Sequence, residues 1–557
     1  MLNALFTDMK KLLKSRIYVW LLVLTAVFSY GFLIVHSGIG IDDTAVQRYY
    51  ADGLEPVMGR WTLYLINKVF HISYFAPFVT DLVGVMILGI SVTLWCALFY
   101  GILKDKVPFM GYCLFSCVFI SAPILGEIYT YYLHNGISIA YGMLALGVGL
   151  YLHGMKKESS KPRIAFLGSF LCLTVAVGCY ESMLIVYIVG VIMVYLLLHI
   201  TDQWKAYHNS IFRWGISGIL IAGLTLALRG IIIKAIILVF GLQDQIGVLA
   251  SRSMSEMLQW FDGSRSVSDF AMVLKRFFLM YYVNGICYFP VTVFVIAVIV
   301  LSLLGLYYTV RHRNLWIIIC VMGIVLFPWV MLIIEGYPTH YRASQYVPLV
   351  CAFAVLLTSY VIGCGTWRGI GKVVPIIGAA VGLILTYNQA SEMNKWFYVD
   401  YLKYEDAKST MNAIALELEA HYDTSKPVII RGSYEVPHGI IKDAYVNDET
   451  WQYQWIKKIL DAIDPHLMEK YYSASGYGYY FSETPLISVI DWGVNAFDDT
   501  NVEFFKFWEM HGHSFVMETD LEKYEEAQQK MTELQMPSWP EEGYIVELEE
   551  YIIVNLG

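Results

Sequence analysis

The chain has 557 residues, of which 57% are hydrophobic and only 15% are charged. Soluble proteins carry about 25% charged residues, so this composition excludes a soluble enzyme of this length, and also a disordered, collagen-like, coiled-coil or disulfide-rich chain. The net charge is −9, but the charges are unevenly distributed. Residues 1–388 contain 26 basic and 16 acidic residues, whereas residues 389–557 contain 12 basic and 31 acidic residues. We therefore predict a membrane domain over 1–388 and a soluble domain over 389–557, whose negative charge argues against nucleic acid as a partner.

The membrane domain contains about eleven apolar runs that approach or exceed the roughly 20 residues needed to cross a bilayer. They lie near residues 17–36, 78–100, 107–125, 136–154, 164–180, 183–200, 214–240, 286–310, 315–335, 343–363 and 371–388. The first run is too long for a cleaved signal peptide and is not followed by a small-residue cleavage site. The sequence thus predicts a polytopic α-helical membrane protein embedded in a lipid bilayer.

Loops rich in Lys and Arg alternate along the chain with loops that lack them, and this alternation predicts the orientation of the chain in the membrane. The basic residues occur before the first run and in every second loop, at Lys10, Lys11, Lys14, Arg16, Lys104, Lys106, Lys156, Lys157, Lys161, Arg163, Lys205, Arg213, Arg311, Arg313, Arg368 and Lys372. The short loops 126–135 and 181–182 have neither Lys nor Arg. Because basic loops stay in the cytoplasm, we expect a cytoplasmic amino terminus and, with an odd number of spans, extracytoplasmic long loops at 37–77 and 241–285 and an extracytoplasmic carboxy-terminal domain.

The nine cysteines all lie in or beside the apolar runs, and the soluble domain has none. Their spacing matches no metal-binding pattern, so we expect them to pack as small buried hydrophobes.

The first long loop holds two adjacent carboxylates, Asp42 and Asp43, about six residues after the first apolar run. Repulsion between neighbouring carboxylates tends to raise the pKa of one of them, which suits a general base, and the pair is also suited to bind a divalent cation. The alternative is structural, since either aspartate is able to cap a helix that starts at Thr44.

Two arginines are predicted near the outer membrane surface, where they could contact a phosphate. Arg60 follows Met58-Gly59 and precedes Trp61, and Arg342 lies just before the run at 343–363. The alternative for both is a surface ion pair or a side chain that extends from the bilayer to the headgroups.

Further acidic and histidine side chains are candidates at the outer ends of the runs. Tyrosines surround Glu127 and His134, which suits either sugar stacking or an aromatic belt at the membrane interface. Glu181 lies at the edge of the hydrocarbon, where a carboxylate is costly and often functional. Glu335 and His340 precede Arg342 closely. A metal site at His340 is not favoured, because the sequence has no second histidine at helical spacing from it.

The soluble domain has the pattern of a mixed α/β fold. Helical spacing covers residues 396–421 and 520–534, a strand is expected over 427–431, and 544–548 with 551–554 form a predicted hairpin after the break at Pro537-Ser-Trp-Pro540.

The order of several motifs resembles the bacterial membrane glucosyltransferases that modify O-antigen and convert serotype, a family with the GT-C architecture. The first is the double aspartate at 42–43 followed by Gly59-Arg60-Trp61. Similar motifs follow at Glu335-Gly-Tyr-Pro-Thr-His-Tyr-Arg342 with Gln345-Tyr-Val-Pro348, at Tyr387-Asn-Gln-Ala390 through Phe397-Tyr-Val-Asp400, and at Met536-Pro-Ser-Trp-Pro540 with Gly543-Tyr-Ile-Val. The resemblance covers nearly the whole chain, least of all residues 430–535.

The resemblance implies transfer of a hexose, usually glucose, from a polyprenyl-phosphate donor to a glycan or lipid-linked glycan outside the cytoplasm of a bacterium. It implies that Asp42 or Asp43 is the general base, that a cation such as Arg60 or Arg342 stabilises the leaving phosphate, and that no nucleotide-binding loop is needed.

Two other functions remain open from the residues alone. A transporter or flippase for lipid-linked sugars would need buried charges near the middle of the spans, whereas Arg229 and Lys234 lie toward one end of theirs. A non-catalytic protein of surface-glycan assembly would tolerate loss of both aspartates.

Overall fold

The computed structural model describes residues 2–36, 59–70, 77–129, 135–208, 210–241, 266, 268–271, 274, 292–327, 329, 343–365, 373–432, 434, 458, 462 and 502–557. The chain divides into two compact units. The helical unit comprises Met1–Val35, Arg48–Asn394 and Glu449–Ser475, and the tail unit comprises His36–Gln47, Lys395–Asp448 and Gly476–Gly557.

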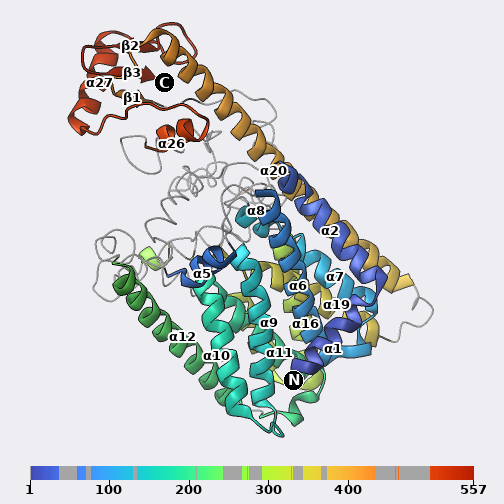
Figure 1. The fold of residues 1–557 in the computed structure, drawn as a ribbon. Helices are drawn as coiled ribbons and strands as arrows, with labels where there is room; N and C mark the ends of the chain where they lie inside the picture. Colours follow the sequence, from blue (N-terminus) through green and yellow to red (C-terminus); the bar gives the residue numbers. More distant parts are fainter. Residues whose placement is uncertain are drawn as a thin grey trace. The chain divides into compact units, whose positions relative to one another are not determined.

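Nine helices in the described part of the chain are long and apolar enough to cross a membrane (Figure 1). They are α2 (Arg16–Val35), α6 (Pro77–Leu103), α9 (Asn135–Met155), α10 (Pro162–Cys179), α11 (Met183–Ile200), α12 (Ile211–Phe240), α16 (Thr292–His312), α19 (Val347–Cys364) and the long α20 (Val373–His421). The prediction of a mostly helical chain with several apolar helices long enough to cross a membrane is therefore confirmed.

Two further apolar helices, α7 (Phe109–Ile120) and α17 (Leu315–Leu326), are shorter than a bilayer span. Each of the eleven predicted runs contains an apolar helix, but the count of eleven spans stays a prediction. The run at 107–125 is split because α7 ends before Pro123, which lacks an N–H and begins a separate helix, α8 (Pro123–Tyr129).

Two short helices of the helical unit were not predicted. The amphipathic helix α1 (Leu2–Leu13) buries Leu5 and Leu12 and packs against α6. The helix α5 (Trp61–Phe70) lies inside the first long loop and packs against α9 and α10 (Figure 1).

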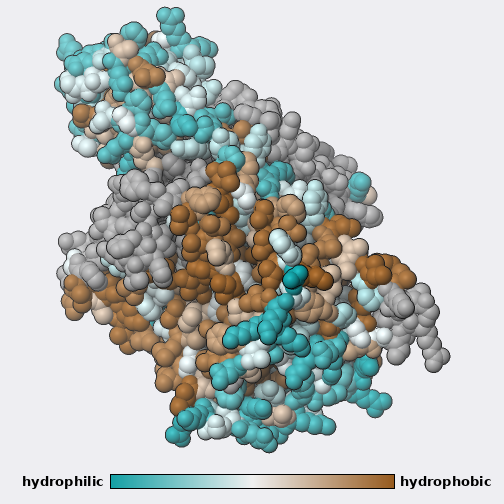
Figure 2. Space-filling model, turned by 45° about the vertical axis from the view of Figure 1, so that its right-hand side comes forward, coloured by the Kyte–Doolittle hydropathy of each residue, from teal (hydrophilic) through white to brown (hydrophobic). Residues whose placement is uncertain are grey.

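Three of the basic loops lie side by side at one end of the helical unit. Gln203 donates a hydrogen bond to the Ile102 carbonyl oxygen over 2.8 Å, and the Lys157 N–H donates to the Ala206 carbonyl oxygen over 3.1 Å. The visible face of this unit carries a belt of hydrophobic residues with hydrophilic residues at one end (Figure 2). Three of the loops that were predicted to share the cytoplasmic side, near residues 103, 157 and 205, are thus neighbours in space.

The tail unit contains a three-stranded sheet of β1 (Val428–Arg431), β3 (Ile552–Asn555) and β2 (Ile545–Glu547), in the order β1-β3-β2. β1 pairs with β3 in parallel, with Val428 opposite Ile552, and β2 pairs with β3 antiparallel, with Val546 opposite Ile553. The predicted strand at 427–431 and hairpin at 544–554 are confirmed.

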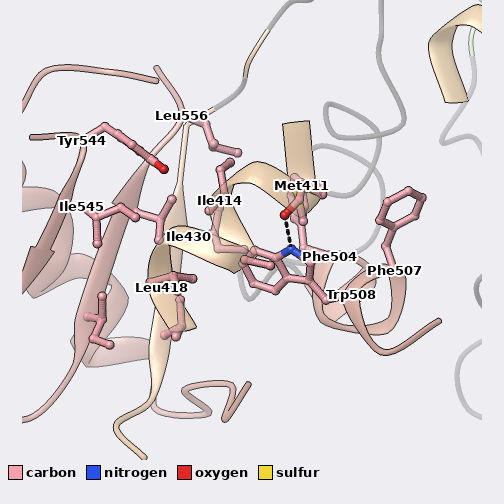
Figure 3. Close-up of a cluster of buried hydrophobic side chains, with 14 of the residues drawn as sticks. Met411, Ile414, Leu418, Ile430, Phe504, Phe507, Trp508, Tyr544, Ile545 and Leu556 are labelled. Atoms are coloured by element: carbon pink, nitrogen blue, oxygen red, sulfur yellow. Dashed lines mark hydrogen bonds between the residues drawn. The ribbon is translucent and has the colours of Figure 1, made fainter. Parts of the chain in front are cut away.

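Successive side chains of a strand point to opposite faces of the sheet, and both faces of this sheet are apolar. Helices therefore cover both faces. Ile429 and Ile553 face Tyr524, Ala527 and Met531 of α27 (Leu521–Glu533). On the other face the sheet packs against the end of α20 and α26 (Val502–Met510), where Trp508 donates a hydrogen bond to the Met411 carbonyl oxygen over 2.9 Å (Figure 3). The predicted helices at 396–421 and 520–534 are also confirmed, the first as part of the longer α20.

Candidate functional site

The predicted site residues are only partly within the structure that is described. Asp42, Asp43, His134, Glu335, His340 and Arg342 lie outside the described residues, and for Glu127 only its place in α8 is described. Arg60 and Glu181 are described, and the Arg60 guanidinium lies over the ring of Tyr180, the residue before Glu181.

Arg60 stands at the start of α5, where the chain approaches the end of α10. Gly178 of α10 lies so close that a Cβ there would be 2.6 Å from the indole nitrogen of Trp61. This close approach requires a glycine and fixes the first turn of α5 on α10. Gly59 is also required, because its φ of +88° lies in the left-handed region that disfavours other residues.

The break between α10 and α11 supplies the partner of Arg60. α10 ends at Cys179, and Tyr180 has an extended backbone with its N–H bonded to the Ala176 carbonyl oxygen over 3.1 Å. The Arg60 guanidinium lies 5.2 Å from the centroid of the Tyr180 ring. This is a cation–π contact.

Glu181 forms an ion pair with Arg229, which extends from α12. The Arg229 side chain is 19% exposed and that of Glu181 is 43% exposed. The Arg229 guanidinium also lies against Gly59, where a Cβ would overlap it. We call Arg60, Tyr180, Glu181 and Arg229 the arginine cluster.

The arginine cluster contains two guanidinium groups. That of Arg229 pairs with the Glu181 carboxylate, and that of Arg60 lies over the Tyr180 ring. Nearby, the Ser182 hydroxyl is buried, with 4% of the residue exposed, and has no hydrogen-bond partner in the described part of the chain. One guanidinium is able to bind two oxygens of a phosphate at once through two parallel hydrogen bonds. A phosphate is therefore an anion that these two arginines suit.

Asp81 is a buried acidic residue that the sequence analysis missed. It lies near the start of α6 and is only 3% exposed. It is close enough to Tyr129 to interact electrostatically, and the Tyr129 hydroxyl shares a 2.5 Å hydrogen bond with Ser138. A lone aspartate within the apolar run 78–100 was the signal, because a charge in a span is costly and usually has a function.

The first turns of α9 connect Asp81 with the arginine cluster. Gly136 faces Leu63 of α5 and Cys179 of α10, whereas Ser138 bonds to Tyr129 on the Asp81 side. Residues two apart point to opposite sides of a helix. The cationic and acidic groups therefore flank the same end of α9, away from the basic loops (Figure 1).

No metal site is apparent among the side chains that the structure describes, where no three His, Cys, Asp or Glu residues come together to hold an ion. All of the described cysteines except Cys364 are buried, as expected for small hydrophobes, and none of them forms a disulfide.

The sequence model of one protein family, described as glucosyl transferase GtrII, matches residues 31–359. The matched part includes the double aspartate, Arg60, Asp81, Glu181, Arg229 and Arg342. It covers the first segment of the tail unit, His36–Gln47, and ends before the other two segments of that unit, Lys395–Asp448 and Gly476–Gly557. Neither the curated proteins nor the solved structures contain a match to the chain.

Proposed function

Because the chain belongs to the GtrII family of glucosyl transferases, we propose that it transfers glucose from a polyprenyl-phosphate donor to a surface glycan or lipid-linked glycan. The transfer takes place on the extracytoplasmic side of a bacterial cytoplasmic membrane. The family match over residues 31–359 carries this proposal, since it covers more than half of the chain and most of the apolar helices.

The catalytic base is Asp42 or Asp43. The acceptor hydroxyl must lose a proton as its oxygen attacks the anomeric carbon, and a carboxylate within about 3 Å is able to accept that proton. The family match supports this role, since it begins at residue 31 and therefore includes both aspartates.

Arg60 and Arg342 bind the phosphate of the donor. The bond between the anomeric carbon and the phosphate oxygen breaks during transfer, and polyprenyl phosphate leaves as an anion that a guanidinium stabilises. The presence of two guanidinium groups in the arginine cluster supports this place for the phosphate, since each carries several N–H donors. Glu127, His134, Glu335 and His340 remain candidates for acceptor contacts.

The decisive experiment measures the transfer of labelled glucose from synthetic polyprenyl-phosphate glucose by the purified full-length protein. Lipid-linked glycans extracted from cells that produce the protein serve as acceptors. Asp42→Asn and Asp43→Asn keep the side-chain shape but remove the proton acceptor, and loss of the base should slow transfer by about 10²–10⁴-fold. Asp52→Asn in the same loop is the matched control, with transfer at the wild-type rate.

Two outcomes would overturn parts of this proposal. If both single variants and the double variant keep more than about a tenth of the rate, neither aspartate is the base. If the protein moves the donor across a vesicle bilayer without transferring glucose, it is a flippase and not a glucosyltransferase of this kind.

A further inference from the structure

Helix α1 has no role in the proposed function, because it lies before residue 31, where the family match begins. It packs on the last turns of α6 at the basic end of the helical unit (Figure 1). Lys11 donates a hydrogen bond to the Tyr100 hydroxyl, and the Asp8 carboxylate lies 3.3 Å from the place of a Cβ at Gly101. Because α6 ends at Leu103, α1 lies at the level where this candidate span ends, which is the level of a membrane interface.

The outer side of α1 is apolar. Leu2, Phe6 and Leu13 are 40%, 42% and 41% exposed, and Met9 is partly exposed between them. Their spacing of four, three and four residues places all four side chains on one face of the helix. The fully buried Leu12 belongs to a different face. α1 therefore has one apolar face within the helical unit and a second that the described part of the chain leaves exposed.

The exposed apolar face continues onto α2. Ser15 separates the two helices, and its hydroxyl accepts a hydrogen bond from the Tyr18 N–H over 3.4 Å. Ile17 and Trp20, in the first turns of α2, are 59% and 63% exposed. Because α2 is a candidate span, these side chains face lipid. Tryptophan is enriched at the membrane–water interface, so the exposed Trp20 indicates that lipid headgroups lie at this level.

Three cations accompany this apolar face. Lys10, Lys14 and Arg16 are exposed, and none of them forms an ion pair within the described part of the chain. The one acidic residue of α1, Asp8, lies on the α6 side instead, close enough to Lys11 to interact electrostatically. The three positive charges are therefore available to an anionic ligand at the level of the headgroups.

We propose that α1 is a membrane-surface helix that binds anionic bilayer lipids. Its exposed apolar face inserts among the acyl chains, while the three cations contact the headgroup phosphates. A soluble protein or a second copy of the chain fits this surface less well, because the apolar face continues without a boundary onto the lipid-facing side chains of α2. The inference does not depend on glucose transfer.

The occupant of the apolar face is tested by crosslinking in membranes of cells that produce the full-length protein. Phe6 is replaced by the photoreactive analogue benzoylphenylalanine, and the illuminated protein is analysed by mass spectrometry. We expect adducts with phospholipid. The same analogue at Thr7, which is exposed on the polar side of α1, is the matched control and should give far fewer of them. Adducts of position 6 with a protein in place of phospholipid would overturn the inference.

The role of the cations is tested by hydrogen exchange of α1 peptides in phosphatidylcholine nanodiscs with and without phosphatidylglycerol. Each Lys or Arg close to an anionic lipid surface strengthens binding by about fivefold. Phosphatidylglycerol should therefore slow the exchange of α1 in the wild-type protein by about fivefold or more. The triple variant Lys10→Gln/Lys14→Gln/Arg16→Gln should lose this dependence on phosphatidylglycerol.

A second triple variant, Lys156→Gln/Lys157→Gln/Lys161→Gln, is the matched control. It removes the same charge from another basic loop, where all three side chains are exposed, and should keep the effect of phosphatidylglycerol on α1. Because each variant is compared with itself in two lipids, a change in the stability of the helix alone does not imitate the result. Equal exchange of α1 with and without phosphatidylglycerol in the wild-type protein would overturn the inference.

Discussion

Charged side chains have different meanings in the two units of this chain. In the helical unit Asp81 is 3% exposed and Arg229 is 19% exposed, and both interrupt apolar helices. In the tail unit, pairs such as Lys530 with Glu533 lie at the surface, where Glu533 is 61% exposed. A charge within a span is costly, whereas an exposed ion pair contributes about 0–1 kcal/mol. Single charges therefore identify functional candidates in the helical unit, while apolar packing decides the stability of the tail unit.

Among the variants that test this contrast, Trp508→Ala in the tail unit should have the largest effect on stability. The buried indole packs in the apolar cluster beside the sheet, and its loss should destabilise the tail unit by about 3–5 kcal/mol. Hydrogen exchange of peptides from β1 and β3 in the full-length protein measures this effect. Leu521→Ala, at a residue that is 58% exposed, is the control with little change. Equal exchange in both variants would show that this cluster does not hold the tail unit together.

Gly178→Ala tests packing in the helical unit. The added Cβ would be 2.6 Å from the Trp61 indole nitrogen, so α5 must shift, and we expect a loss of about 1–3 kcal/mol in stability. The measurement is thermal unfolding in detergent. Gly223→Ala is the matched control, because no atom lies within 4 Å of a Cβ at that position. Unchanged melting of Gly178→Ala would contradict the tight contact between α5 and α10.

Asp81→Asn tests whether a single buried charge has a function. If it does, the variant should reduce glucose transfer by about tenfold or more, which corresponds to about 1.4 kcal/mol, without lowering the melting temperature. Asp105→Asn, at the basic end after the same helix, should transfer at the wild-type rate. A parallel loss of stability and activity in Asp81→Asn would assign the carboxylate a structural role instead.

The smallest expected effect is that of acidification on the tail unit. Burial alone would raise the pKa of Glu518, but the N–H groups of Asp520 and Thr519 and the Lys523 ammonium lower it overall. The ammonium of Lys426 lowers the pKa of Glu547.

A carboxylate whose folded-state pKa is lowered stabilises the fold above its unfolded pKa, and that contribution is lost as the pH falls through the folded value. We therefore expect β1 and β3 to lose protection below about pH 4. Hydrogen exchange, corrected for its intrinsic pH dependence, measures this loss. Equal protection at about pH 7 and pH 3 would contradict it.

Local patterns predicted most of the fold. The apolar runs gave the long helices, and alternating residues gave the strands and the hairpin of the tail unit. The parallel pairing of β1 with β3 was not predicted, because it joins segments that are far apart in the sequence and no local pattern encodes it. The split between α7 and α8 was missed because Pro123 lies inside an otherwise uniform apolar run.

The candidate site was predictable residue by residue but not as an arrangement. Arg60 and Glu181 were both selected from the sequence, yet the contact between their neighbourhoods depends on Gly59, Gly178 and the packing of α5 on α10. Arg229 was noticed only as a charge near the end of a span, and its partner Glu181 is distant in sequence. Asp81 could have been selected by treating every charge inside an apolar run as a candidate.

The strand order β1-β3-β2 has a consequence for the synthesis of the chain. β3 is the last of the three strands to be made, yet it lies between the other two. While the chain is elongating, β1 has to wait for about 120 residues before its neighbour emerges. The sheet therefore cannot assemble strand by strand during synthesis, and the tail unit reaches its fold only after the whole segment from β1 to β3 has been made.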